Sequence, residues 1–184
     1  MYKIAGEQLP CVFDVSARTV ATQSLNIFGD HSDVYACRQT GFAMLCETNP
    51  QEVMDLSPVA HLATIEGKVP FINFFDGFRT SHEIQKIEKW DYADLKEMCN
   101  MDAVEAFRAH ALNPEHPAMR GSHENGDVFF QHREACNTAY NELPAIVEKY
   151  MAKINEKLGT NYDLFNYYGA EDADRVIVAT VSYT

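Results

Sequence analysis

The sequence predicts an α/β domain built on a parallel β-sheet. An apolar run at residues 71–75 stops at Asp76-Gly77, and a cluster of polar and ionisable residues follows at once. An earlier strand pattern covers residues 11–17, and a helical pattern lies between the two. Strands that alternate with helices through short turns are typical of parallel sheets. Ligands of open α/β sheets bind at the carboxyl ends of the strands, so the polar cluster is a candidate site.

The first strand is expected at residues 11–17, which alternate between apolar and polar after Pro10. Gly29-Asp30-His31 marks a turn. Residues 34–46 are ambiguous and fit a strand followed by a helix, with Gly41 between the two.

A helix is expected to begin at Pro50 with Asn49 as its N-cap, because an Asn side chain accepts hydrogen bonds from the first turn and proline suits the first helical position. Pro58 lies inside the apolar pattern and should kink or restart the helix, since proline lacks an N–H group. Gly67 is the expected end, and residues 69–75 form the next strand.

The second half of the chain predicts mostly helices. Short helices are expected at roughly residues 81–88, 91–98 and 102–110, and a long loop at 112–127. Residues 128–130 are expected to form a short strand or a buried anchor. The clearest helical pattern covers residues 144–158, with apolar residues every four positions and Gly159 as the stop. A strand is expected at 175–179, and a domain boundary near 160–174.

The composition disfavours several classes of protein. The chain has 184 residues and a net charge of −12, which argues against nucleic acid and anionic membranes as partners. No run of about 18 apolar residues predicts a membrane span, and the first residues lack a signal-peptide pattern, so we expect a cytoplasmic protein. The five cysteines form no C-x-x-C pair, which argues against an iron–sulfur cluster or a disulfide framework within these residues. Cys37 and Cys46 are interpreted as core thiols.

Arg18 is the first candidate for a binding role, because it directly follows the strand at 12–17. The planar guanidinium group matches a carboxylate through two parallel hydrogen bonds. Position alone leaves a second interpretation open, in which Arg18 forms a salt bridge or lies at a surface edge.

A polar patch flanks the glycine turn at residue 29, and its members are Asp30, His31, Asp33 and Arg38. Histidine can act as a general acid or base because it titrates near neutral pH. A hydrogen-bonded turn is the simpler interpretation of this patch.

A second polar group follows the strand at 69–75, and its members are Asp76, Arg79, His82 and Glu83. A metal site is not supported, because His82-Glu83 lacks the second histidine that a zinc-protease helix needs. We interpret the group as a capping and ion-pair network with Ser81 as N-cap, and Arg79 as a residue that faces a cleft. Four more histidines lie in or near the long loop at irregular spacing, and ordinary loop polarity explains them better than zinc; they are His110, His116, His123 and His132.

One segment resembles a known protein family. The stretch FFDGFRTSHEIQKIE, residues 74–88, closely resembles part of the pyruvate:ferredoxin (flavodoxin) oxidoreductases, thiamine-diphosphate enzymes that split pyruvate and pass its electrons to an iron–sulfur carrier. Further blocks resemble the same family in order and with similar spacing, at residues 1–7, 15–18, 27–33, 37–43, 59–63, 113–117 and 175–179. Residues 180–184 depart from the family pattern.

The resemblance implies that the chain is an internal segment from the pyruvate-binding half of a much longer enzyme. Residues 1–160 are then an incomplete parallel-sheet domain of the thiamine-diphosphate-binding type. Residues 161–174 form a linker, and 175–184 begin a second α/β domain with its first strand. We expect the isolated segment to be inactive and, because its apolar sheet edges would be exposed, to self-associate.

The resemblance also implies a function. The full enzyme oxidatively decarboxylates pyruvate to acetyl-CoA and CO2 and reduces ferredoxin or flavodoxin. Thiamine diphosphate, Mg2+, [4Fe–4S] clusters and coenzyme A are its cofactors, and none is bound wholly by this segment. The complete enzyme is expected to be a homodimer. The alternatives are a relative that acts on another 2-oxo acid, or a non-catalytic assembly domain.

For the site, the resemblance assigns Arg18 to the pyruvate carboxylate. It implies that His31 and Arg38 lie near the wall of the active-site cavity, and we place Arg79 there as well. No catalytic residue and no metal ligand is assigned within this segment. The loop at 113–117 resembles that of the pyruvate-specific members.

Overall fold

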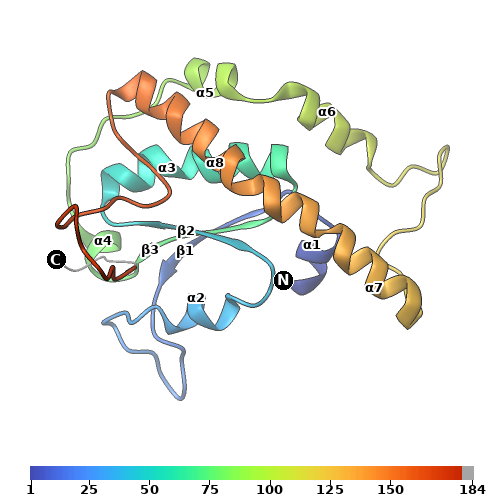
Figure 1. Cartoon of the computed structure of the whole chain (residues 1–184), viewed down its shortest axis with the longest axis horizontal. Helices are drawn as coiled ribbons and strands as arrows, with labels where there is room; N and C mark the ends of the chain where they lie inside the picture. Colours follow the sequence, from blue (N-terminus) through green and yellow to red (C-terminus); the bar gives the residue numbers. More distant parts are fainter. Residues whose placement is uncertain (180–184) are drawn as a thin grey trace.

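The computed structural model describes residues 1–179 and shows a three-stranded parallel sheet with helices on both faces (Figure 1). The strands are β1 (Val12–Ala17), β2 (Ala43–Glu47) and β3 (Phe71–Asp76), in the order β1-β3-β2. Both pairings are parallel, with Val12 opposite Phe71 and Ala43 opposite Phe71 on the other side. The predicted α/β class is therefore confirmed.

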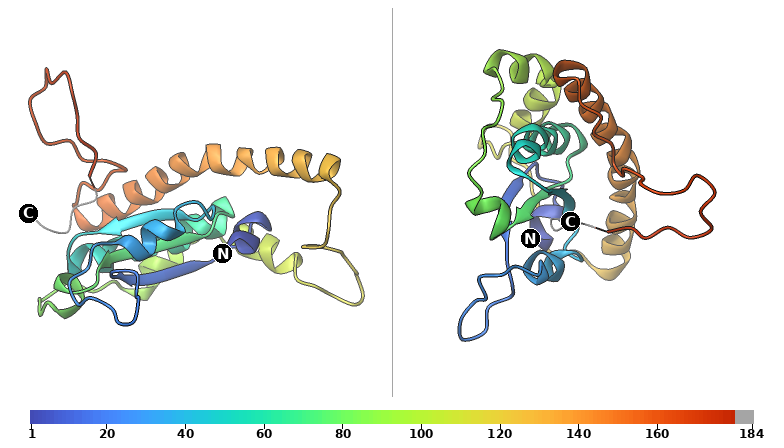
Figure 2. Two further views of the ribbon diagram at one scale, coloured as in Figure 1. Left: turned by 90° about the horizontal axis from the view of Figure 1, so that it is seen from below. Right: turned by 90° about the vertical axis from the view of Figure 1, so that its left-hand side faces the viewer.

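Two short helices cover one face of the sheet, and two long helices cover the other (Figures 1 and 2). The first pair is α1 (Tyr2–Gly6) and α2 (Ser32–Cys37), and the second is α3 (Pro50–Gly67) and α8 (Asn137–Leu158). The remaining helices are α4 (Arg79–His82), α5 (Tyr92–Met98), α6 (Met101–Ala109) and α7 (Gly126–Ala135). None of the helices within residues 1–179 is long and apolar enough to cross a membrane.

The central strand feeds two apolar cores, because successive side chains of a strand point to opposite faces. Phe71 packs with α3 and α8 in the larger core, while Ile72 and Phe74 pack with α1 and α2 in the smaller one. The predicted core thiols Cys37 and Cys46 pack against the smaller core. The central strand β3 is thus buried on both faces, which leaves the strand ends as the natural place for a site.

Helix α3 follows its sequence signals at both ends. The Asn49 side chain accepts a hydrogen bond from the Glu52 N–H at 3.0 Å, as an N-cap does. Pro58 lies inside one continuous helix, so the expected restart at this residue does not occur. Proline cannot donate to the carbonyl of Met54, one turn earlier, and the indole N–H of Trp90 donates to that carbonyl instead, at 3.1 Å.

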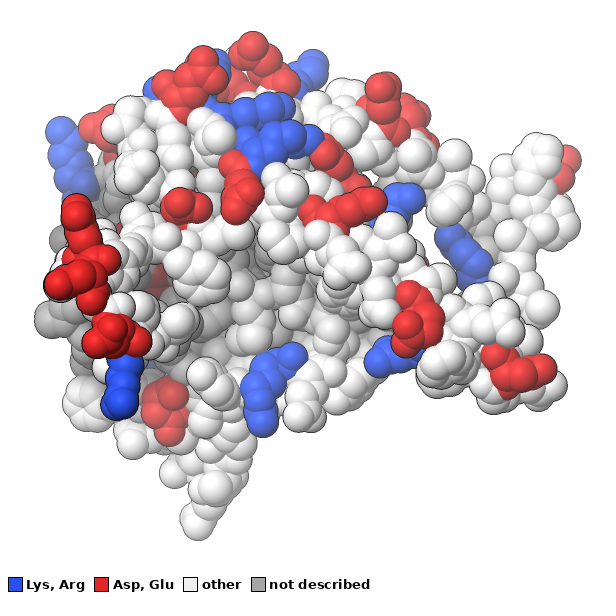
Figure 3. Space-filling model, in the orientation of Figure 1, with Lys and Arg blue, Asp and Glu red and all other residues white. Residues whose placement is uncertain are grey.

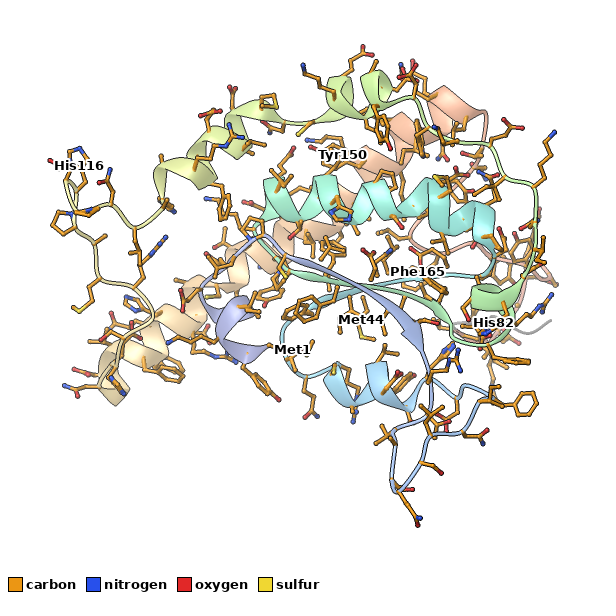
Figure 4. The ribbon with its side chains drawn as sticks, turned by 180° about the vertical axis from the view of Figure 1, so that it is seen from behind. Met1, Met44, His82, His116, Tyr150 and Phe165 are labelled. Atoms are coloured by element: carbon orange, nitrogen blue, oxygen red, sulfur yellow. The ribbon has the colours of Figure 1, made fainter. Side chains whose placement is uncertain are left out.

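Glu66 joins three helices at the end of α3. Its carboxylate accepts hydrogen bonds from the Tyr150 hydroxyl at 2.6 Å, from the Asn100 side chain at 3.1 Å and from Lys149. Tyr150, labelled in Figure 4, is fully buried between α8 and α3. Burial alone would raise the pKa of Glu66, but the three donors outweigh burial and lower the pKa to about 2.

Several expected elements are corrected by the structure. In residues 34–46 the helix comes first and the strand second, because His31 turns the chain at φ 61° before α2 and Gly41 turns it at φ 90° before β2. The helix expected at 81–88 is reduced to the single turn α4, and residues 83–91 have no regular structure. There the Gln51 side chain holds the backbone of Glu88 through both its N–H and its carbonyl.

Two expected strands are also absent from the described part of the chain. Residues 128–130 lie in α7 and are exposed, so they form neither a strand nor a buried anchor. Residues 175–179 carry no strand and are exposed. Neither segment lies beside a strand with which it pairs within residues 1–179. Helix α8 begins earlier than expected and ends at Gly159, as predicted, with φ 69°.

Charge is distributed unevenly over the face seen in Figure 3. Acidic and basic side chains are interspersed over the upper helices, and the middle of this face carries few charges.

Candidate functional site

The candidate site lies where β1 and β3 end side by side. Ala17 is opposite Asp76 in the parallel register, so Arg18 and Gly77 are the first residues beyond the two strands. The Gly77 N–H donates to the Ala17 carbonyl at 2.8 Å. This is the carboxyl edge of the sheet, as expected for a ligand site of an α/β fold.

Arg18 is held from two directions at this edge. Its backbone N–H donates to the Asp33 carboxylate at 2.8 Å, and the Asp33 N–H donates to the Arg18 carbonyl at 3.4 Å. Its guanidinium group donates to the Ile27 carbonyl at 3.4 Å. The contact with Asp33 is to the backbone of Arg18, and the Arg18 guanidinium group forms no salt bridge within residues 1–179.

Two glycines allow the chain to pack closely around Arg18. A Cβ atom on Gly77 would lie 2.2 Å from the Ala17 carbonyl oxygen and 2.3 Å from Nε of Arg18. A Cβ atom on Gly29 would lie 2.9 Å from the same carbonyl oxygen and 3.3 Å from Oδ1 of Asp76. Both positions exclude a side chain, because real Cβ atoms do not approach other atoms so closely.

Asp76 is fully buried and organises the turn after β3. Its carboxylate accepts hydrogen bonds from the backbone N–H groups of Phe78 and Arg79. Phe78 is the N-cap of α4, so Ser81 is not the cap that the sequence predicted. Asp76 satisfies the first N–H groups of this turn from outside the helix. The Ser81 hydroxyl donates to the Gly77 carbonyl at 2.7 Å instead.

His31 is the second predicted residue at this edge. Its Nε2 atom lies 4.0 Å from Oδ1 of Asp76, and its ring meets that of Phe74 edge-on at 5.7 Å. Nε2 is buried and makes no hydrogen bond with any residue of the described chain. His31 thus lies next to the end of β3.

Arg79 and Arg38 differ in their positions. Arg79 begins α4, is exposed and shares Asp76 with the same turn. Arg38 lies at the opposite end of α2 from His31, donates to the Tyr35 carbonyl at 2.8 Å and stacks over the Tyr35 ring at 5.9 Å. The structure therefore gathers Arg18, His31 and Arg79 but not Arg38.

The long loop is remote from this edge. Figure 4 labels His116, in the loop at 113–117, at the opposite end of the molecule from His82 of α4. Within this chain, the loop residues therefore do not contribute to the group around Arg18.

A buried carboxyl group on the other face of the sheet was not anticipated. Glu47 ends β2 and is fully buried, and neither carboxylate oxygen has a hydrogen-bond partner among the residues that the structure describes. Burial and then the charge of Asp14 raise the pKa of Glu47 to about 9. Nearby Asn73 donates to Asp14 and to Ser57, each at 2.9 Å. A carboxylate at the end of a strand, such as Glu47, is a sequence signal for a buried site group. The burial of Glu47 depends on α3, which packs against β2.

The donors at the edge fit a carboxylate ligand. Arg18 presents a guanidinium group beside a backbone that two glycines keep open, and guanidinium binds carboxylates well. For a metal-bound diphosphate the fit is poorer, since residues 1–179 contain no group of three or more His, Cys, Asp or Glu side chains placed to hold a metal ion.

Comparison with known proteins agrees with the residue-level resemblance. Residues 1–152 match the sequence profile of the family described as "Pyruvate flavodoxin/ferredoxin oxidoreductase, thiamine diP-bdg". A pyruvate-flavodoxin oxidoreductase of Enterobacter agglomerans is 63% identical over 179 residues, or 97% of this chain and 15% of the relative. A pyruvate:ferredoxin oxidoreductase of Moorella thermoacetica is 58% identical over the same shares of the two chains.

A third relative, a pyruvate dehydrogenase [NADP(+)] of Cryptosporidium parvum, is 52% identical over 97% of this chain and 9% of its own length. The chain thus spans about 15% of the length of the bacterial relatives that it matches. With a matching profile over most of its length, the chain belongs to the thiamine-diphosphate-binding family of the pyruvate flavodoxin/ferredoxin oxidoreductases.

Proposed function

We propose that this chain forms the substrate-orienting part of an enzyme that converts pyruvate and coenzyme A to acetyl-CoA and CO2. Two electrons and one proton are released per pyruvate, and iron–sulfur clusters pass the electrons to ferredoxin or flavodoxin. The names of the relatives support pyruvate as the substrate. Arg18 at the carboxyl ends of β1 and β3 is the observation that carries the proposal.

In this proposal the residues of the chain bind and orient the substrate. Arg18 holds the carboxylate of the 2-oxo acid before CO2 leaves, and the partly buried His31 and the exposed Arg79 line the same side of the cavity. When bound, thiamine diphosphate supplies the electron sink for the loss of CO2. The remainder of the enzyme binds Mg2+, the [4Fe–4S] clusters and coenzyme A, and the whole acts as a cytoplasmic homodimer.

The test uses the full-length enzyme that contains this segment. Pyruvate- and coenzyme-A-dependent reduction of a low-potential dye is measured for the wild type, for Arg18→Ala and for the control Arg108→Ala, whose side chain is exposed on α6. We expect Arg18→Ala to lose roughly 2–4 kcal/mol of transition-state stabilisation, or about 30- to 1,000-fold in kcat/KM. Arg108→Ala should behave like the wild type.

Two outcomes contradict the proposal in different ways. Full activity of Arg18→Ala removes Arg18 from the site and leaves the reaction standing. Turnover of a different 2-oxo acid in place of pyruvate changes the substrate, and no turnover with any 2-oxo acid favours an assembly role for the domain.

A further inference from the structure

The side chain of Arg18 lies directly across the backbone of Gly77. A Cβ atom at Gly77 would lie 2.2 Å from the Ala17 carbonyl oxygen, 2.3 Å from Nε of Arg18 and 2.5 Å from Cδ of Arg18. Any other residue at this position would therefore displace both the end of β1 and the side chain of Arg18. Arg18 and Gly77 follow different strands and meet only because β1 and β3 end in register. Gly77 is buried, so its backbone forms a fixed surface beneath the guanidinium group of Arg18.

The backbone of Arg18 is fixed separately by Asp33. The Asp33 carboxylate accepts from the Arg18 N–H at 2.8 Å, and the Asp33 N–H returns a hydrogen bond to the Arg18 carbonyl at 3.4 Å. Asp33 therefore sets where the side chain of Arg18 starts, and Gly77 sets the direction in which it runs.

We propose that Gly77 and Asp33 are positioning residues that orient the guanidinium group of Arg18 toward the substrate carboxylate. This inference rests on the proposed function of Arg18. A free arginine side chain loses about 2 kcal/mol of rotamer entropy when it is immobilised, and a side chain that is already oriented loses less on binding. By holding Arg18 in one orientation, Gly77 and Asp33 thus favour small substrates whose carboxylate can reach the fixed position of the guanidinium group.

The proposal is tested by double-mutant cycles in the full-length enzyme. Gly77→Ala and Asp33→Ala are each made in the wild-type and the Arg18→Ala backgrounds, and kcat and KM for pyruvate are measured with dye reduction. Gly126→Ala is the matched control, because a Cβ atom there meets nothing within 4 Å.

We expect Gly77→Ala to lower kcat/KM by roughly 10- to 100-fold, since a displacement of about 1 Å at a bound substrate can cost that much. The loss should be mainly a rise in KM, because the carboxylate contact is made in the bound substrate. The contact of an added Cβ with the Ala17 carbonyl oxygen remains in the Arg18→Ala background, so some loss is expected there as well. That loss should be smaller than in the wild-type background by about threefold or more, since residues that act through one group are not additive. Gly126→Ala should remain within about twofold of the wild type in both backgrounds.

Equal losses from Gly77→Ala in both backgrounds overturn the proposal, because a purely structural defect acts whether or not Arg18 is present. If Gly77→Ala does not fold, the Asp33→Ala cycle decides alone by the same criterion. The proposed reaction fails separately, when the wild type turns over no 2-oxo acid. The proposed role of Arg18 fails when Arg18→Ala keeps the kcat/KM of the wild type. If the wild type turns over pyruvate and Arg18→Ala lowers kcat/KM, equal losses of kcat/KM from Gly77→Ala in the two backgrounds reject only the positioning role.

Discussion

Neutralising Glu66 tests whether the junction of α3, α6 and α8 is stabilised by charge. Glu66→Gln keeps the shape and an oxygen acceptor for Tyr150 and Asn100, but removes the attraction to Lys149. The shift in the Glu66 pKa from 4.5 to about 2 corresponds to at most about 3 kcal/mol. The side chain of Lys149 is 44% exposed, and solvent screening reduces the expected loss to about 1–2 kcal/mol at pH 7.

The pH dependence has a definite sign. The folded-state pKa of Glu66 is lowered, so its contribution to the free energy of unfolding is complete above pH 4.5 and is lost as the pH falls through about 2. The difference between the wild type and Glu66→Gln should therefore shrink to less than half of its neutral-pH value at about pH 3.

The assay is urea unfolding of the chain at both pH values, followed by the fluorescence of Trp90. This is the single tryptophan of the sequence, and it is buried in the core that α3 and α8 share. Glu105→Gln is the control, because its ion pair with Arg108 is about two-thirds exposed and should contribute almost nothing. A difference for Glu66→Gln that stays constant between neutral and acidic pH would refute the assigned role of the charge.

Two further changes probe other buried groups. Since the pKa of Glu47 is raised to about 9, its ionisation opposes folding increasingly above pH 4.5. In urea unfolding, the free energy of unfolding of Glu47→Gln should therefore rise relative to that of the wild type between pH 5 and pH 8. A difference between the two proteins that does not change with pH would contradict the raised pKa of Glu47. Tyr162→Phe removes the hydroxyl that donates to the buried Asp55 at 2.8 Å. It should lower the free energy of unfolding by about 1–3 kcal/mol, whereas the exposed Tyr168→Phe should have no effect; equal values for the two variants would contradict the assignment.

The elements that the sequence predicted well are those with local signals. Asn49 and Pro50 start α3, and Gly159 ends α8, because capping and left-handed turns involve residues only a few positions apart. Strand β2 was misplaced, since its position depends on pairing with β3, which lies beyond a whole helix in the chain. The sequence predicts a helix in the segment before α5, which is irregular, because the contacts of this segment with Gln51 are also distant in sequence.

The candidate site shows the same division. Arg18 could be placed at a strand end from its neighbours alone, and the Asp76-Gly77 pair marked the end of β3. That Gly77 lies under Arg18 could not be predicted, because it requires the order and register of two strands. Likewise, the burial of Glu47 depends on packing across the sheet and not on its adjacent residues.

The proline within α3 also determines where a distant segment attaches. An interior proline normally costs a helix about 3 kcal/mol or more, yet here it leaves the Met54 carbonyl open to the indole of Trp90. The Met54 carbonyl thus fixes where the irregular segment of residues 83–91 attaches to α3. A residue with an N–H group at position 58 would make the helix and the indole compete for the same oxygen. A more regular α3 would thus come at the expense of order in the chain that follows α4.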